Sequence, residues 1–292
     1  MKDCMATNKA YSVRFANSNV GKRLEDNRQL RDVLVDLIND RGVKDAVGHH
    51  LPPVELEGDH FQVRNLLKVG QCWRGCFARL RDEAPHVIDA QNKEKQLNLQ
   101  VGDRILEKTY FLYYEDSDIL VFQMSRNVGY LTKFAHYWSS LFVHEYVDFP
   151  PAVDRNQLQH VLNSEIRYVE FTYACPPGGG SGSGPKWTQR AMDMLRPIHG
   201  AVGKFTMRAP KNSVLGGHIK ELIKWMANRG EVERAKVLLQ DEKDPIDLFI
   251  DPIKVKITVP LHANYPDEKA VLEELAEAYS DQHSRLPIRN RT

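Results

Sequence analysis

Residues 107–142 constrain the fold of this chain more than any other stretch. Two runs rich in aromatic and branched aliphatic residues, 110–114 and 119–124, flank the short acidic segment 115–118. The length and composition of that segment are typical of a tight hairpin turn. Because both runs are strongly apolar, we expect both faces of the hairpin to be buried. A glycine and a helical pattern follow, so this stretch predicts a mixed α+β core.

A bulky apolar stripe marks the expected helix after this hairpin. Its apolar positions have the i, i+3, i+4, i+7 and i+8 spacing of an amphipathic helix and are Phe134, Tyr137, Trp138, Leu141 and Phe142. Thr132 is the expected N-cap of this helix. An earlier stripe from Leu30 to Ile38 predicts a second amphipathic helix, with Gly42 as its C-terminal stop. We interpret both stripes as core that packs against a sheet.

Residues 60–81 predict a second hairpin, with its turn near Gly70. On its second strand the side chains alternate between two faces, so Arg79 and Arg81 share a face with Phe77. Further strands are expected at 10–16, 166–174, 201–208, 248–250 and 255–259, and further helical segments at 219–226, 232–239 and 267–279. The predicted fold class is α+β, with hairpins of antiparallel strands packed against amphipathic helices in two domains.

A pair of prolines within residues 148–156 indicates a linker between these domains, because proline is stiff and donates no ladder hydrogen bond. We therefore predict an N-terminal α+β domain over 1–150 and a C-terminal α+β domain over 157–292. The second domain contains the glycine- and serine-rich segment 176–185, which is typical of a flexible loop. This segment resembles an engineered linker, so we draw no functional inference from it.

The composition favours a soluble protein. Of the 292 residues, 42% are hydrophobic and 27% are charged, which are ordinary proportions for a globular chain. No apolar run reaches the roughly 18 residues that a membrane-spanning helix needs, and the N-terminus lacks the pattern of a signal peptide. The four cysteines are too few and too scattered to form a disulfide framework. These features predict a cytoplasmic location with no direct membrane insertion.

The sequence contains no catalytic motif that we can assign. It lacks a Walker-type phosphate loop, a GxSxG elbow and an HExxH metal motif. Cys72 and Cys76 lack the second pair that a structural zinc site needs, so buried thiols are the favoured interpretation. Asp116 and Asp118 lie in the expected turn without a nearby lysine. We therefore predict a non-enzymatic protein without cofactor or metal, and we retain a metal-dependent nuclease as an alternative.

Charge is unevenly distributed although the net charge is only +1. Residues 186–229 contain nine Lys or Arg and two acids, and residues 63–81 contain five Lys or Arg and no acid. Such segregation indicates a surface that faces a polyanion if the two stretches meet in space. The alternative is that both stretches are solvated faces without a partner. No helix-turn-helix, zinc-finger or RNA-recognition motif supports base-specific binding.

The order of elements resembles the RexA-like phage-exclusion proteins, a family of DNA-binding antiphage-defence proteins. The matching segments are QLRDVLVDLI, the hairpin over 60–81, YFLYYEDSDILVFQMSRNVG with the helix TKFAHYWSSLF, and IKVKITV just after DLFIDP. The resemblance implies a cytoplasmic, non-enzymatic homodimer that binds DNA with little sequence preference. It also places Lys254 and Lys256 where that family carries basic residues. The segment 176–185 departs from the family pattern and leaves the native loop undefined.

The leading prediction is a sequence-nonspecific DNA-binding sensor or effector of a phage-exclusion or antiphage-defence system. Its expected partners are the phosphate backbone of double-stranded DNA and a second copy of the chain, with a membrane or effector protein as a further candidate. The predicted DNA-binding residues are Arg74, Arg79, Arg81, Lys204, Arg208, Lys211, Lys220 and Lys224 from charge placement, and Lys254 and Lys256 from the resemblance. Besides the nuclease, a dimeric interaction scaffold with the helix 132–143 at its interface stays an alternative.

Overall fold

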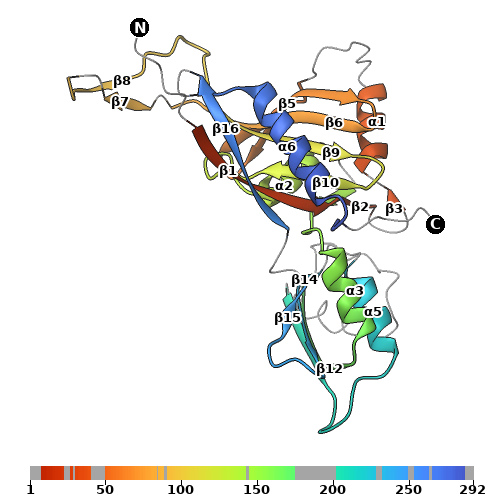
Figure 1. The fold of residues 1–292 in the computed structure, drawn as a ribbon. Coiled ribbons are helices and arrows are strands. Elements are labelled where there is room, and N and C mark those ends of the chain that lie inside the picture. Colours follow the sequence, from red (N-terminus) through yellow and green to blue (C-terminus); the bar gives the residue numbers. More distant parts are fainter. Residues whose placement is uncertain are drawn as a thin grey trace.

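An eight-stranded antiparallel sheet forms the larger part of the molecule (Figure 1). The computed structural model describes residues 8–22, 27–28, 30–40, 50–83, 85–88, 91–142, 145–174, 202–227, 232–248, 253–262 and 265–286. The strand order in the sheet is β17-β16-β1-β10-β9-β6-β5-β4. These strands are β1 Asn8–Asn17, β4 Val54–Leu56, β5 Asp59–Val69, β6 Cys72–Arg81, β9 Ile105–Tyr114, β10 Ile119–Gln123, β16 Lys254–His262 and β17 Tyr265–Pro266.

Both hairpins predicted from the sequence are confirmed. β9 and β10 pair from Ile119 opposite Tyr114, and β5 and β6 pair around a turn at Gly70, whose φ is +61°. The acidic turn between β9 and β10 is largely buried. Asp118 accepts hydrogen bonds from Ser18 and from the hydroxyl of Tyr113. The turn therefore closes the hairpin and also anchors it to the residue that follows β1.

Helices cover both faces of the large sheet (Figure 1). On one face, α1 (Leu30–Asp40) and α2 (Leu131–Leu141) share a core with the sheet that includes Leu34, Phe134 and Phe122. On the opposite face, α6 (Glu268–Gln282) packs through residues such as Leu275 against Val121. Val121 and Phe122 are neighbours on β10 but pack into the cores on opposite faces of the sheet, because side chains alternate along a strand. This arrangement confirms the expectation that both faces of the hairpin are buried.

A second, smaller sheet lies below the first in Figure 1. Its strand order is β13-β12-β14-β15, and all its pairings are antiparallel. The strands are β12 Ile166–Ala174, β13 Val202–Arg208, β14 Val232–Leu239 and β15 Ile246–Asp247. Two helices, α3 (Arg155–Asn163) and α5 (His218–Ala227), form one core with this sheet that includes Val161, Phe171 and Ile223. The whole protein is therefore of mixed α+β class, as predicted.

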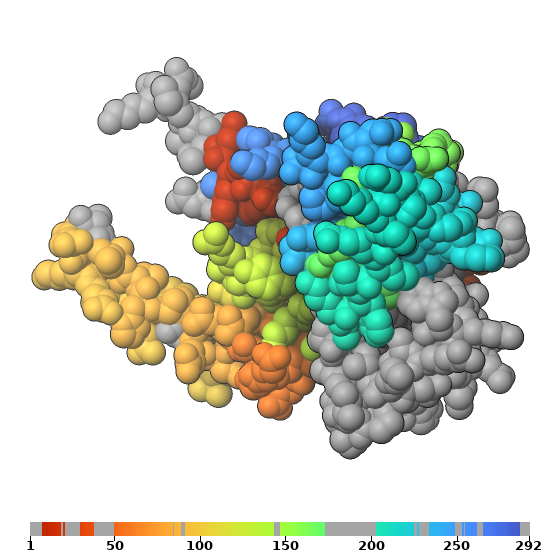
Figure 2. All heavy atoms as spheres, turned by 90° about the horizontal axis from the view of Figure 1, so that it is seen from below, coloured from red at the N-terminus to blue at the C-terminus, as the bar shows by residue number. Residues whose placement is uncertain are grey.

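Two smaller strand groups complete the described structure. β2 (Asn19–Lys22), β3 (Asn27–Arg28) and β11 (Glu145–Asp148) form a three-stranded sheet. β7 (His86–Ile88) and β8 (Glu94–Gln96) form a hairpin that projects from the body of the molecule (Figures 1 and 2). No helix in the described part of the chain has both the length and the apolar character to cross a membrane.

Several local expectations were wrong. Residues 232–239 form the strand β14 rather than a helix, because the alternate residues Ala235 and Val237 are buried against α3 and α5. The N-cap of α2 is Tyr130 and not Thr132. The last strand of the small sheet spans Ile246–Asp247, whereas the expected strand at 248–250 runs into residues outside the described part.

The proline pair does not form an exposed linker. The backbone N–H of Asn17 donates to the carbonyl of Pro150 at 2.8 Å, and that of Ala152 donates to the carbonyl of Phe15 at 2.9 Å. Ala152 is 1% exposed. The prolines lack N–H groups, but their neighbours continue the pairing beside β1. This segment is therefore fixed along the large sheet before α3 begins at its Asp154 cap.

The chain returns to the large sheet after it completes the small one. β16 pairs with β1, with Ile257 opposite Tyr11, and α6 packs on the face described above. Both elements fall within the predicted C-terminal domain 157–292, but the structure places them on the large sheet. Long-range pairing decides this placement, and no local pattern encodes it. The glycine- and serine-rich segment 176–185 lies outside the described residues.

Candidate functional site: the basic face of the small sheet

One face of the small sheet carries a cluster of cations. Along β13 the residues Phe205 and Met207 face the helices, so the alternating residues Lys204, Thr206 and Arg208 face the other way. The same alternation applies to β12 and β14. We call the side opposite the helices the basic sheet face, and its members are Tyr168, Glu170, Thr172, Lys204, Thr206, Arg208, Arg234, Lys236, Leu238 and Asp247.

The strand register arranges these side chains in three rows across the sheet. The first row holds Lys204, Thr172 and Arg234, the second Thr206, Glu170 and Lys236, and the third Arg208, Tyr168 and Leu238. Directly opposed residues on neighbouring strands lie close enough for their side chains to interact. The side chain of Lys204 is 60% exposed and that of Arg234 is 47% exposed. Four cations and two carboxylates give this face a net charge of +2, and its outer cations are accessible.

Glu170 organises the centre of the face. Its carboxylate accepts a hydrogen bond of 2.6 Å from the hydroxyl of Tyr168 and lies 3.0 Å from the Nζ of Lys204. The Tyr168 hydrogen bond and the Lys204 charge hold the pKa of Glu170 below its usual value. The same hydrogen bond raises the pKa of Tyr168. At neutral pH the face therefore contains an ionised carboxylate flanked by a neutral phenol and an ammonium group.

The arginines of the face are also held in place. The guanidinium of Arg208 lies over the ring of Tyr168, 5.6 Å from its centroid. Arg234 pairs with Asp247 of β15 at 3.2 Å. Lysine and arginine on strands project from a rigid scaffold, and they can neutralise nucleic-acid phosphates and release counterions. An aromatic ring beside them adds a surface on which a base can stack.

The structure brings only two of the predicted residues together on this face, Lys204 and Arg208. Two further cations, Arg234 and Lys236, were missed because residues 232–239 were interpreted as a helix. Their signal is present in the sequence as the alternation of charged residues with Ala235 and Val237. A period of two across this segment would have predicted a strand with Arg234 and Lys236 on the same face.

The other predicted residues of the small-sheet region lie elsewhere. Lys220 and Lys224 belong to α5, which covers the opposite side of the sheet. Lys211 is exposed in the turn that follows β13. These three residues therefore do not extend the basic sheet face.

The predicted residues of the large sheet are divided over several places. Arg79 pairs with Asp59 at 2.8 Å and Arg81 with Glu107 at 3.4 Å. Arg74 projects from the opposite face of β6, on the side of α6. The remaining two are on β16, where Lys256 is exposed and Lys254 is the first residue of the strand. The basic stretch 63–81 is thus split between two faces of one sheet.

Within the described residues we find no group of three or more His, Cys, Asp or Glu side chains that could hold a metal ion. Burial raises the pKa of both Cys72 and Cys76 to about 11, so neither thiol is a ready nucleophile at neutral pH. Asp118, one of the two turn acids considered for a metal-dependent nuclease, is buried and accepts hydrogen bonds from Ser18 and Tyr113.

The chain belongs to a protein family described as a family of unknown function (DUF6731), whose model matches residues 54–289. The matched region runs from β4 to beyond α6 and includes the whole basic sheet face. A search of the curated proteins found no match. The family description names no activity, so the resemblance to RexA-like proteins stays a prediction.

Proposed function

We propose that this member of the DUF6731 family is a non-enzymatic protein that binds double-stranded DNA through its phosphate backbone on the basic sheet face. The observation that carries the proposal is the alignment of Lys204, Arg208, Arg234 and Lys236 on one open sheet face. These four cations lie on β13 and β14, on either side of the carboxylate of Glu170 on β12. Two of them are already held in position by Tyr168 and Asp247.

The proposal includes no base preference. Lysine and arginine contacts to phosphates fix the position of a protein on DNA but carry no sequence information. Each neutralised phosphate makes the logarithm of the binding constant fall by about 0.9 per unit of the logarithm of salt concentration. With four phosphate contacts, affinity should fall roughly 100-fold between about 50 mM and 200 mM salt.

We further propose that the small sheet with α3 and α5 is a separate DNA-binding domain. It has its own buried core, which includes Val169, Phe171 and Leu222. The role in phage exclusion or antiphage defence, the cytoplasmic setting, the homodimer and the membrane or effector partner rest on the sequence resemblance to RexA-like proteins.

The experiment that tests the proposal is a titration of fluorescent duplex DNA of mixed sequence with the full chain at two salt concentrations. Magnesium is present, and the DNA is run on a denaturing gel afterwards. We expect salt-sensitive binding of intact DNA with equal affinity for unrelated sequences. The absence of binding at low salt would refute the proposal. Cut DNA that becomes intact when a chelator is added would favour the nuclease alternative instead.

A further inference from the structure

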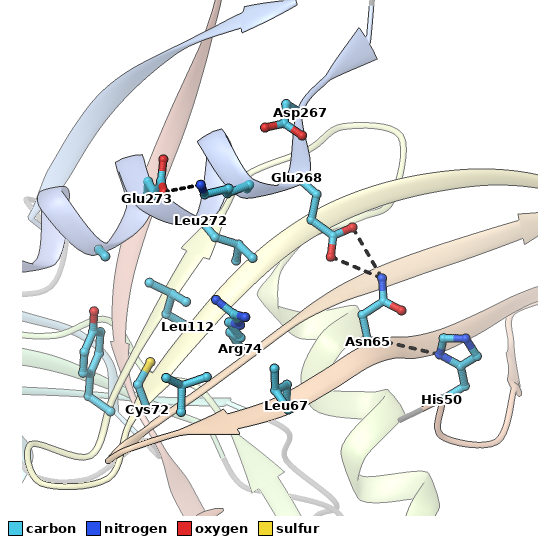
Figure 3. A pocket seen from close by; sticks show the side chains of 14 residues that line it. His50, Asn65, Leu67, Cys72, Arg74, Leu112, Asp267, Glu268, Leu272 and Glu273 are labelled. Atoms are coloured by element: carbon cyan, nitrogen blue, oxygen red, sulfur yellow. Dashed lines mark hydrogen bonds and ion pairs between the residues drawn. The ribbon is translucent and has the colours of Figure 1, made fainter. Parts of the chain in front are cut away.

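A cleft of about 800 Å³ lies between α6 and the strands β5, β6 and β9 (Figure 3). Its volume is within the range of about 300–1,000 Å³ that is usual for small-molecule sites. The cleft belongs to the large sheet and shares no residue with the basic sheet face. It is therefore a second candidate site that the proposed DNA binding does not use.

The floor of the cleft is apolar. Leu67 of β5, Leu112 of β9 and Leu272 of α6 line it, and Cys72 and Tyr114 continue the same surface. Desolvation raises the pKa of the Cys72 thiol to about 11 and also raises that of Tyr114. Burial is the largest cause of both shifts, and both side chains are half-buried beside the leucines.

Arg74 places a positive charge within these apolar walls. In the sheet register it is directly opposite Leu67 on one side and Leu112 on the other. Figure 3 shows its guanidinium between Leu112, Leu272 and Asn65. Among the described residues, no side chain forms a hydrogen bond or ion pair with this guanidinium. Its donors are therefore available to a bound group.

The carboxylates around the cleft have other partners. Glu268 accepts a hydrogen bond of 3.2 Å from the side chain of Asn65 and lies 3.9 Å from the Nζ of Lys108. Glu273 pairs with Lys269 at 3.7 Å. Asn65 has a left-handed φ of +53° within the irregular part of β5, which directs its amide towards α6 (Figure 3). Asp267 caps α6 and accepts a hydrogen bond of 3.2 Å from the backbone N–H of Ala270, so each of the three acids that line the cleft has a partner other than Arg74.

We propose that this cleft binds an organic anion with an apolar body. A planar guanidinium can bind a carboxylate or phosphate through two parallel hydrogen bonds. The aliphatic body of the ligand would lie against Leu67, Leu112 and Leu272, where burial of its methylene groups is favourable. The guanidinium of Arg74 and the apolar floor together define this class of ligand. The assignment is independent of DNA binding.

Isothermal titration calorimetry of the full chain with octanoate, octyl phosphate and 1-octanol tests the proposal. We expect saturable binding of at least one anion at a single site, with 1-octanol binding at least about tenfold more weakly because it lacks the charge. The anion that binds more tightly identifies the preferred headgroup. No saturable binding of either anion at millimolar concentration would overturn the proposal, and so would equal binding of 1-octanol.

Two variants test whether the ligand binds in the cleft. Arg74→Gln should weaken binding of the anion by about tenfold or more, since a hydrogen bond to a charged group is lost. Leu272→Trp should fill the apolar floor and abolish binding even if Arg74→Gln proves poorly folded. Arg104→Gln removes an equal charge in the exposed pair with Asp82 and should leave the affinity unchanged. Unchanged affinity in folded Arg74→Gln, or in folded Leu272→Trp, would show that the ligand is elsewhere.

Discussion

The hydroxyl of Tyr168 donates a hydrogen bond of 2.6 Å to the carboxylate of Glu170, two residues further along β12. The same carboxylate pairs with Lys204 on the neighbouring strand β13. One acid therefore links the aromatic side chain and a cation of the basic sheet face. It also lowers the positive charge that this face presents to DNA. A substitution at Glu170 can therefore change the charge of the face while it keeps the shape of the side chain.

Glu170→Gln should strengthen DNA binding. The substitution raises the net charge of the basic sheet face from +2 to +3 and keeps an oxygen that can accept from Tyr168. We expect an affinity gain of roughly fivefold at low salt and a smaller gain at high salt, because added salt screens the effect. Fluorescence anisotropy with labelled duplex measures it. Glu277→Gln on α6 makes the same charge change away from the face and should have little effect.

A loss of affinity in Glu170→Gln would contradict this prediction. It would mean that the ion pair with Lys204 positions the lysine for phosphate and that this positioning outweighs the repulsion. Unchanged affinity would indicate that DNA does not approach Glu170 at all.

The depressed pKa of Glu170 gives this effect a definite pH dependence. Because the hydrogen bond from Tyr168 and the charge of Lys204 favour the ionised carboxylate, Glu170 should remain charged below its ordinary pKa of 4.5. The affinity ratio between Glu170→Gln and the wild type should therefore stay constant from pH 7 down to about 4.5 and approach one only at lower pH. If the two affinities become equal well above pH 4.5, the carboxylate of Glu170 lacks these partners in solution.

Truncation of Trp138 should destabilise the protein. Trp138 is 0% exposed and its ring contacts Phe134 and Tyr137 within the core of the large sheet. Trp138→Ala should lower the free energy of unfolding by about 3–5 kcal/mol, measured by urea denaturation. Trp138→Phe keeps most of the packing and should lower the free energy of unfolding by clearly less. Folded monomers of unchanged stability after Trp138→Ala would instead support the scaffold alternative, with α2 at a dimer interface.

Glu115 should be important for stability although it lies in a turn. Its side chain is 6% exposed and accepts hydrogen bonds from Trp73 at 2.6 Å and from Lys68 at 2.7 Å. Glu115→Ala leaves the buried indole N–H of Trp73 without its acceptor. We expect the free energy of unfolding to fall by about 3 kcal/mol. Asp116→Asn changes the exposed neighbouring acid and should cost at most about 0.5 kcal/mol. Equal thermal stability of the two variants would contradict this account.

Local patterns predicted the two hairpins and the helices α1, α2 and α6 because turn residues and apolar spacing determine these elements. The segment VERAKVLL satisfied both a helical and a strand spacing, and pairing with β12 decided the outcome. The return of β16 to β1 could not be predicted, since no local signal states which sheet a strand joins. The same limit applies to the site. Lys204 and Arg208 were predicted as DNA-binding residues from charge placement. Their alignment with Arg234 and Lys236 depends on strand register, which no local pattern states.

The most direct test compares two charge-matched double variants in a duplex-DNA titration. Lys204→Glu with Arg208→Glu reverses two charges on the basic sheet face, and Lys220→Glu with Lys224→Glu reverses two charges on α5, behind the same sheet. We predict that the first variant loses at least roughly tenfold in affinity and has a shallower salt dependence, whereas the second changes by less than about threefold. An equal loss in both variants, or a loss in the α5 variant alone, would contradict DNA binding on the basic sheet face.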